Sequence, residues 1–558
     1  MTRAFLLFVA LVSAMMVVVP ANVFADKEGQ SFEVTKFLMQ TVSSTNEIGL
    51  EEGGVRNGVR ESEVTRVENV PYTYTQAGGH PWGLTTKIDF ASEDVVAPGN
   101  VITGAPTRDV KDVITNLPPG LLGNPMAVPR CSLTFVVSRN SDEHCPADTQ
   151  VGVFVYRHEG GGETLSPIVN VTPEAGQSAE FALENTEAVD TPLLTGHLVR
   201  TPQGYAFTVV GNNIPLVDIE AVELTFWGVP GDPSHDPMRG LLCDTVTGRP
   251  KLNCQGGDEH FGYSPVVPFL TIGTDCAAGP QLATVRADSW EEPGRWVEEQ
   301  SEAPLPTVLS PAPQSGVTGC QGLQFQPTIE VEPDTLLADE PVGLGVDLKV
   351  PLSEGPGALA TPQLRNTVLT LPEGLSVSPG IVDGIEACEA TGPNGIDIPT
   401  GLNSRGEPLQ PGELGEGEEL GLNGEPQLAP GHCPDASIVG TAEAFTPLLP
   451  EPVKGHVYLA EPGCGGPGQR ACTEQDALDG NLYRLYLELG GEGALAKTGV
   501  HFKVPLETAA NPATGQLTAR TLGTPQAPFS ELKIHLNGGR VHRLTIPPHV
   551  DRRSRRQI

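Results

Sequence analysis

The sequence predicts an all-β fold of tandem, disulfide-stapled β-sandwich-like repeats with long Gly/Pro-rich loops. Gly and Pro (65 and 53 of 558 residues) make up about a fifth of the chain, whereas aromatic residues make up 5% and charged residues 18%. This composition suits loop-rich β structure and is poor material for long helices. Apolar and polar residues also alternate along several short segments, and two parts of the chain repeat the same motifs.

Length and charge limit the classes of function. At about 150 residues per domain, 558 residues correspond to three or four domains, each large enough to bury a core. Asp and Glu outnumber Lys and Arg by 69 to 34, which gives a formal net charge of −35. Because so acidic a surface repels a phosphate backbone, the sequence predicts no nucleic-acid partner.

The N-terminus is typical of a signal peptide that spans residues 1–25. Arg3 precedes an apolar stretch over residues 4–19 that only Ser13 interrupts, and small residues lead up to Ala25. An uncleaved membrane anchor is the alternative, although the stretch is shorter than a spanning helix needs. We expect no transmembrane segment after the signal peptide, and an extracellular protein that is secreted or non-covalently attached to the cell surface.

The number and position of the cysteines also indicate an extracellular, oxidising compartment. All ten lie after the signal peptide, and an even number in an oxidising compartment indicates five disulfides. No C-x-x-C is present, so the sequence argues against zinc. The predicted sequential pairs are Cys131 with Cys145, Cys243 with Cys254, Cys276 with Cys320, Cys388 with Cys433, and Cys464 with Cys472.

Three motifs occur twice in the same order and indicate an internal repeat. They are Pro-Trp-Gly-Leu at 81–84 and Pro-Val-Gly-Leu at 341–344, Leu-Pro-Pro-Gly-Leu at 117–121 and Leu-Pro-Glu-Gly-Leu at 371–375, and His-Cys-Pro at 144–146 and 432–434. We therefore expect an N-terminal arm (26–79), a first β repeat (80–275), a Pro-containing connector (276–325), a second β repeat (326–539) and a basic tail (540–558).

Each repeat ends in a clear strand. Residues 222–226 and 532–536 alternate between apolar and polar side chains, and residues 483–489 show the same pattern. A period of two with one polar face is typical of antiparallel sheets that face water on one side. With short strands and Pro/Gly turns throughout, a β-sandwich is the favoured architecture.

The second repeat carries an insertion over residues 401–431. This segment is rich in Gly and Glu, so it has little apolar surface to offset the entropy of ordering it, and we expect a mobile, solvated loop. Calcium binding is the alternative, although no known calcium-loop pattern is present. No cofactor is predicted otherwise.

The composition changes abruptly at the C-terminus. Residues 540–558 contain six arginines and a single acidic residue, Asp551. Two readings stay open: a basic tail that docks on an anionic polymer or on the protein's own acidic surface, or a reading-frame shift near Gly539 that leaves the tail out of frame.

A search for catalytic motifs is largely negative. No G-x-S-x-G, H-E-x-x-H or phosphate-binding loop is present. A weak candidate site is Asp232, Ser234, His235 and Asp236, although neighbours in sequence do not form a triad by themselves. A turn that ends a strand is the plainer interpretation.

The four tryptophans are candidates for a different kind of site. Trp82, Trp227, Trp290 and Trp296 would suit a sugar-stacking surface, with packing in the core as the alternative.

The motif Trp-Gly-Val-Pro-x-Asp-Pro-Ser-His-Asp (227–236), together with residues 117–121 and 371–375, resembles a family of large, uncharacterised secreted β-repeat proteins of actinobacteria. The resemblance covers nearly all of residues 70–539. It implies an extracellular location and a β-rich fold, but the family has no established activity and no catalytic residue carries over. Such proteins continue with further Cys-containing β repeats where this chain has its basic tail.

The leading hypothesis is a secreted or cell-surface structural and interaction protein without catalytic activity, whose partners are an envelope polymer or other surface proteins. Binding in such proteins resides in loops that the sandwiches present. The first alternative is a protein that binds carbohydrate or cell-wall polymer, with or without calcium. A weaker alternative is a secreted hydrolase.

Overall fold

The computed structural model describes most of the chain between residues 30 and 538. The described ranges are 30–42, 49–56, 59–65, 73–97, 100–136, 145–158, 162–174, 177–184, 191–201, 204–239, 243–244, 266–279, 282–301, 316–337, 342–353, 355–372, 386–403, 405–407, 409, 413–420, 426–465, 469–492, 500–511, 513–514 and 516–538. The predicted signal peptide, the basic tail and Cys254 lie outside the described residues.

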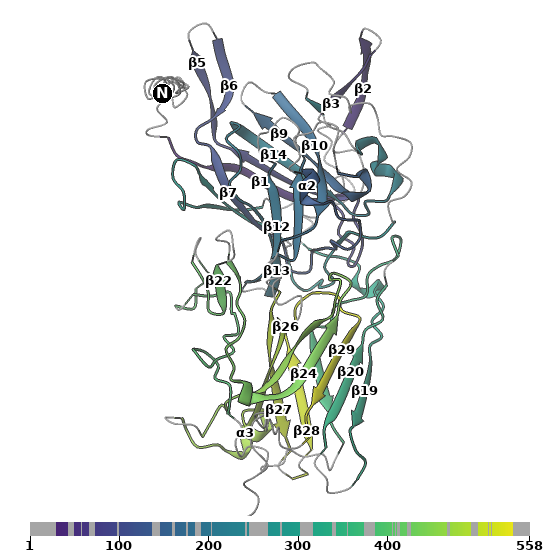
Figure 1. Ribbon diagram of the computed structural model, residues 1–558, viewed down its shortest axis with the longest axis vertical. Coiled ribbons are helices and arrows are strands. Elements are labelled where there is room, and N and C mark those ends of the chain that lie inside the picture. The colour runs from purple at the N-terminus through teal and green to yellow at the C-terminus, as the bar shows by residue number, and fades with distance from the viewer. Residues whose placement is uncertain are drawn as a thin grey trace, which may run out of the picture.

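The all-β prediction is confirmed. Two large antiparallel sheets account for most strands, and the α-helices in the described part of the chain are the short α2 (Leu133–Val136) and α3 (Glu474–Leu478). Figure 1 shows the sheets stacked end to end along the longest axis of the molecule.

The first sheet has twelve strands and curls into a nearly closed barrel. Its strands are, in spatial order, β1 (Val34–Val42), β4 (Gly83–Phe90), β14 (Ile219–Trp227), β9 (Gln150–His158), β10 (Gly162–Val171), β11 (Ala179–Leu183), β12 (Leu193–Thr201), β13 (Gly204–Gly211), β7 (Val110–Asn116), β17 (Thr284–Ser289) and β18 (Val297–Gln300), with β15 (Cys243–Asp244) attached to β10. The last strand, β18, lies beside the first, β1. The expected sandwich is thus one twisted sheet that coils until its ends meet.

The second sheet has nine strands among the described residues, and its two terminal strands do not pair with each other there. Its strands are, in spatial order, β19 (Thr328–Pro333), β20 (Leu344–Lys349), β29 (Glu531–Leu536), β24 (Ile438–Phe445), β25 (Val453–Leu459), β26 (Tyr483–Glu492), β27 (Phe502–Ala510), β28 (Leu517–Leu522) and β21 (Asn366–Thr370). Its inner face forms one apolar cluster that includes Val457, Leu487 and Val504.

The two sheets share one topology, which extends the sequence repeat to the fold. Taken in chain order, the nine strands β1, β4, β7, β9 to β14 of the first sheet follow the same spatial path as β19, β20, β21, β24 to β29 of the second. The His-Cys-Pro motif explains one matching detail. In each copy a 3₁₀ turn follows it, and the Thr149 and Ser437 hydroxyls each donate to the proline carbonyl oxygen three residues earlier, at 2.6 Å.

The first sheet extends beyond the limits expected from sequence. Strand β1 belongs to the segment expected as an N-terminal arm, and β17 and β18 belong to the segment expected as a connector. All three pair with or lie beside strands of the first repeat, because an edge strand is set by distant partners and not by its own composition.

Smaller two-stranded sheets accompany the two large sheets. Three are hairpins: β2 (Gly49–Arg56) with β3 (Val59–Thr65), β5 (Ser92–Ala97) with β6 (Asn100–Pro106), and β22 (Glu418–Leu420) with β23 (Pro426–Leu428). A fourth pairs two strands that lie far apart in the chain, β8 (Leu122–Gly123) and β16 (Leu270–Thr271). The hairpins β2–β3 and β5–β6 project from the end of the first sheet that faces away from the second (Figure 1).

Four of the five predicted disulfides are present. They join Cys131 to Cys145, Cys276 to Cys320, Cys388 to Cys433, and Cys464 to Cys472. The predicted Cys243–Cys254 pair falls outside the described residues. None of the helices in the described ranges has the length and hydropathy that crossing a bilayer requires.

Candidate functional site

The candidate residues Asp232, Ser234 and His235 form a turn after β14, in which Asp232 and Ser234 are half-buried and His235 is buried. The Asp232 carboxylate accepts a hydrogen bond from the Ser234 backbone N–H at 2.8 Å, which closes an Asx turn into the 3₁₀ segment Pro233–Met238. The Ser234 hydroxyl accepts a hydrogen bond from Trp82 Nε1 at 3.1 Å. The side chain of Asp236 lies outside the described residues.

His235 is packed between two aromatic rings. Its ring stacks on Trp227 at a centroid distance of 4.6 Å and lies 4.7 Å from the Trp82 ring, and its side chain is almost fully buried. Burial, with the nearby Arg239 charge, lowers the pKa of His235 to about 3. The ring is therefore neutral at physiological pH.

This arrangement suits packing and not hydrolysis. A general base must reach both its nucleophile and the substrate, but His235 is sealed from solvent and its Nδ1 atom has no hydrogen-bond partner among the described residues. The Ser234 hydroxyl is engaged by Trp82. The cluster fixes the end of β14 against β4, and the hydrolase hypothesis gains no geometric support.

The tryptophans do not form one surface. Trp227 is fully buried and Trp82 packs against the same cluster, so both serve the core. Trp290 is 37% exposed, and its ring faces the ammonium group of Lys111 at 5.4 Å. Trp296 carries the guanidinium group of Arg286 over its ring at 5.8 Å. The two accessible rings thus already have cationic partners.

No group of three or more His, Cys, Asp or Glu side chains in the described ranges is placed to hold a metal ion. The calcium alternative therefore has no geometric support in that part of the chain.

An apolar cavity inside the first sheet has the geometry of a binding site. It has a volume of about 310 Å³ and is partly open to solvent. Side chains that point inward from opposite strands line it, among them Ile88 on β4, Phe154 on β9, Phe181 on β11 and Val209 on β13. Period-two alternation creates this lining, because every second residue of each strand faces the interior.

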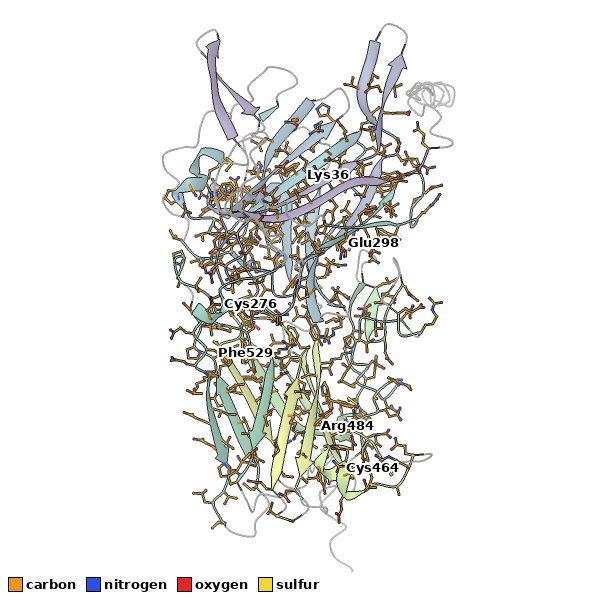
Figure 2. All side chains as sticks on the ribbon, turned by 180° about the vertical axis from the view of Figure 1, so that it is seen from behind. Lys36, Cys276, Glu298, Cys464, Arg484 and Phe529 are labelled. Atoms are coloured by element: carbon orange, nitrogen blue, oxygen red, sulfur yellow. A yellow bond between two sulfur atoms is a disulfide. The ribbon has the colours of Figure 1, made fainter. Side chains whose placement is uncertain are left out.

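The cavity continues into the second sheet. Val453, Leu487, Leu489 and Phe502 of the second sheet line it together with the first-sheet residues. The loop between β28 and β29 adds Phe529, which is labelled in Figure 2 at the level where the sheets meet. One cavity is therefore shared by both repeats.

The polar content of the lining is low. The side chains that face the cavity and can form hydrogen bonds are neutral hydroxyls. The described lining contains no charged residue. Thr86, Thr115, Tyr156, Ser178 and Thr208 come from the first repeat, and Thr446 and Thr524 come from the second. Such a cavity accepts hydrocarbon and rejects a charged group, which would lose its hydration without a partner.

Direct contacts fix the two sheets around the cavity. The Ala360 backbone N–H donates to the Gly78 carbonyl at 2.6 Å, and Arg365 pairs with Asp275 at 3.3 Å. The Tyr205 hydroxyl donates to the Lys503 carbonyl at 3.1 Å and accepts from its N–H at 3.2 Å. The cavity therefore passes through a junction that several direct contacts stabilise.

The repeated Leu-Pro-Pro-Gly-Leu motif lies at this junction. Gly120 has a φ of +86°, and a Cβ atom there would lie 2.6 Å from Gln526 Oε1 and 3.0 Å from the Gly273 Cα. Only glycine combines this conformation with such close approach. The motif thus lets the first sheet's loop pack against the β28–β29 loop of the second.

The insertion also braces the junction, in contrast to the solvated loop that its composition indicates. Leu428 is 1% exposed and packs with Leu198, Tyr205 and Val500, which belong to both repeats. The physical reason is local: Leu428 and its neighbour Ala429 are apolar residues at the end of a Gly- and Glu-rich segment, and they bury themselves between the two sheets.

Sequence reasoning did not find the cavity. The alternating strands reveal which side chains face inward, but not whether opposite faces meet or leave space.

No family model, curated protein or solved structure matches this chain. The site must therefore be interpreted from its own geometry.

Proposed function

We propose that this protein is a secreted, non-catalytic binding protein that holds an apolar ligand, such as the hydrocarbon part of a lipid, in the cavity that the two repeats share. The observation that carries the proposal is a continuous interior lined by hydrocarbon and neutral hydroxyl groups, with no charged residue among the described lining residues. Cavities of this size and character are the usual sites for small apolar ligands.

The energetics support an occupant. The lining side chains that face this space have fewer dispersion contacts than side chains in a filled core. An apolar molecule that supplies those contacts would stabilise the fold, whereas water finds few hydrogen-bond partners in such a site.

The disulfides agree with an oxidising compartment. Four pairs are formed among the described cysteines, which supports export from the cytosol as the sequence predicts. Export and attachment to envelope polymers or surface proteins remain parts of the proposal. A carrier of apolar molecules also fits the leading sequence hypothesis of a protein without catalytic activity.

Titration of the mature protein (residues 26–558) with a fluorescent fatty acid tests the proposal. We expect saturable binding, and we expect a ligand at about 100 times its dissociation constant to add about 2.7 kcal/mol to the free energy of unfolding. Val209→Trp places a large ring in the cavity and should abolish binding. Val368→Trp, the same change on an exposed strand position, should leave binding intact.

Circular dichroism and thermal unfolding show whether Val209→Trp has kept its fold. If wild-type protein binds no apolar probe, or if both Val→Trp variants bind equally well, the cavity is not a ligand site and the proposed function is wrong.

A further inference from the structure

The two sheets differ in how they end. In the first sheet the hairpin β17–β18 follows β7: β17 pairs with β7, and β18 lies beside β1. In the second sheet the corresponding strands, β21 and β19, are the terminal strands among the described residues. The nearly closed first sheet therefore shows what kind of element fits between the ends of this topology.

The hairpin of the first sheet completes an apolar interior. Val285 and Ala287 on β17 are fully buried, and Val297 on β18 packs against the same core. The corresponding part of the second sheet stays accessible. Ile329 on β19 lies opposite the buried Leu348 of β20 and faces inward with it, yet Ile329 is 44% exposed.

The charges on β19 narrow the choice of partner. Glu330 and Glu332 alternate with Ile329 and Val331, so they lie on the outer face of the strand, and both are exposed. Charged side chains on an edge strand discourage unspecific pairing. A partner strand with lysine or arginine opposite these glutamates would meet an attraction, whereas an acidic strand would meet repulsion.

We propose that the two open edges of the second sheet, β21 and β19, bind a β-hairpin from a partner polypeptide that has an apolar inner face and cationic outer side chains. The hairpin would pair with β21 and lie beside β19, as β17–β18 does between β7 and β1. This is strand addition to a sheet edge, in which backbone hydrogen bonds give affinity and side chains give selectivity. The inference is independent of the apolar ligand.

A synthetic copy of the chain's own hairpin, residues 283–301, is the probe. One labelled peptide has the native sequence, and the other carries Glu298→Lys and Gln300→Lys on its outer face. Fluorescence anisotropy with the mature protein should show saturable binding of the lysine peptide, and the native peptide should bind about tenfold more weakly. In a protein with Glu330→Lys and Glu332→Lys, this order of affinities should be reversed.

Two leucine-sized positions provide a matched pair of variants. Ile329→Asp should weaken the binding of the lysine peptide by about tenfold or more, because it places a charge on the apolar inner face of β19. Leu336→Asp, at a 91% exposed position just outside the strand, should change nothing. Both residues are partly or largely exposed, so both variants should fold.

Three results would overturn the inference: no saturable binding of either peptide, an order of affinities that the charge reversal leaves unchanged, or equal effects of the two Asp variants. Analytical ultracentrifugation adds a fourth. A dimer that Ile329→Asp dissociates would assign the edge to a second copy of this chain instead of a hairpin.

Discussion

Replacing Leu428 by alanine tests whether the insertion is part of the junction between the repeats. Leu428 is 1% exposed, and its neighbours Leu198, Tyr205 and Val500 come from three different segments. Because the rigid strands β12 and β13 supply two of these neighbours, the site has little freedom to collapse. We therefore expect a loss of about 3 kcal/mol in the free energy of unfolding, within the range for buried Leu→Ala changes.

Guanidinium unfolding, followed by far-UV circular dichroism, gives this free energy, and limited proteolysis reports whether the insertion has become accessible. The matched control is Leu420→Ala in the same insertion, where the side chain is 58% exposed and the expected loss is within about 0.5 kcal/mol. If both variants lose the same small free energy of unfolding, the insertion is not packed at the junction. It would then be the solvated loop that its composition indicates.

Three further predictions concern pH, the disulfides and the tryptophans. Burial lowers the pKa of His235 to about 3 and that of His501 to about 4, so below about pH 6.5 the unfolded chain takes up protons that the folded protein does not. The free energy of unfolding, measured with denaturant, should therefore fall by up to about 1.4 kcal/mol per pH unit for each ring as the pH decreases from 6.5 to 4. His235→Phe should reduce this fall. Removing the Cys276–Cys320 bridge with Cys276→Ser should cost about 4 kcal/mol for a separation of 44 residues, and peptide mass mapping without reduction should find this pair in the native protein. Trp290→Ala should leave co-sedimentation with cell-wall polymer unchanged, because Lys111 already covers the ring; loss of retention would favour the carbohydrate alternative.

Strands with a clear two-residue period were predictable. Residues 222–226 and 532–536 fall within β14 and β29, because alternation is a local property of a half-buried strand. The sequential disulfides were also predictable, because each bridge joins two cysteines that follow one another along the chain. In contrast, β17 and β18 lie in a segment whose Glu, Pro and Gly residues indicate a linker. Their strand character depends on β7, which lies far away in sequence.

The candidate site was less predictable than the fold. The pattern around His235 contains residue types that suit catalysis, but its burial between two tryptophans appears only when β4 and β14 are placed side by side. The cavity was harder still to predict. The number of strands in a curled sheet sets the width of its interior, and the sequence of a single strand does not reveal that number.

The two repeats are not independent modules, although their topology is the same. The second sheet has fewer strands and does not close, so part of its inner face needs another cover. Phe502 supplies a direct example: it belongs to the apolar inner face of the second sheet, and its ring contacts Tyr205 of the first sheet at a centroid distance of 5.7 Å. The first repeat therefore covers part of the interior of the second. A stiff spacer of separate sandwiches would bury each core alone, whereas this chain places one apolar interior across both halves, which is the arrangement that a shared ligand requires.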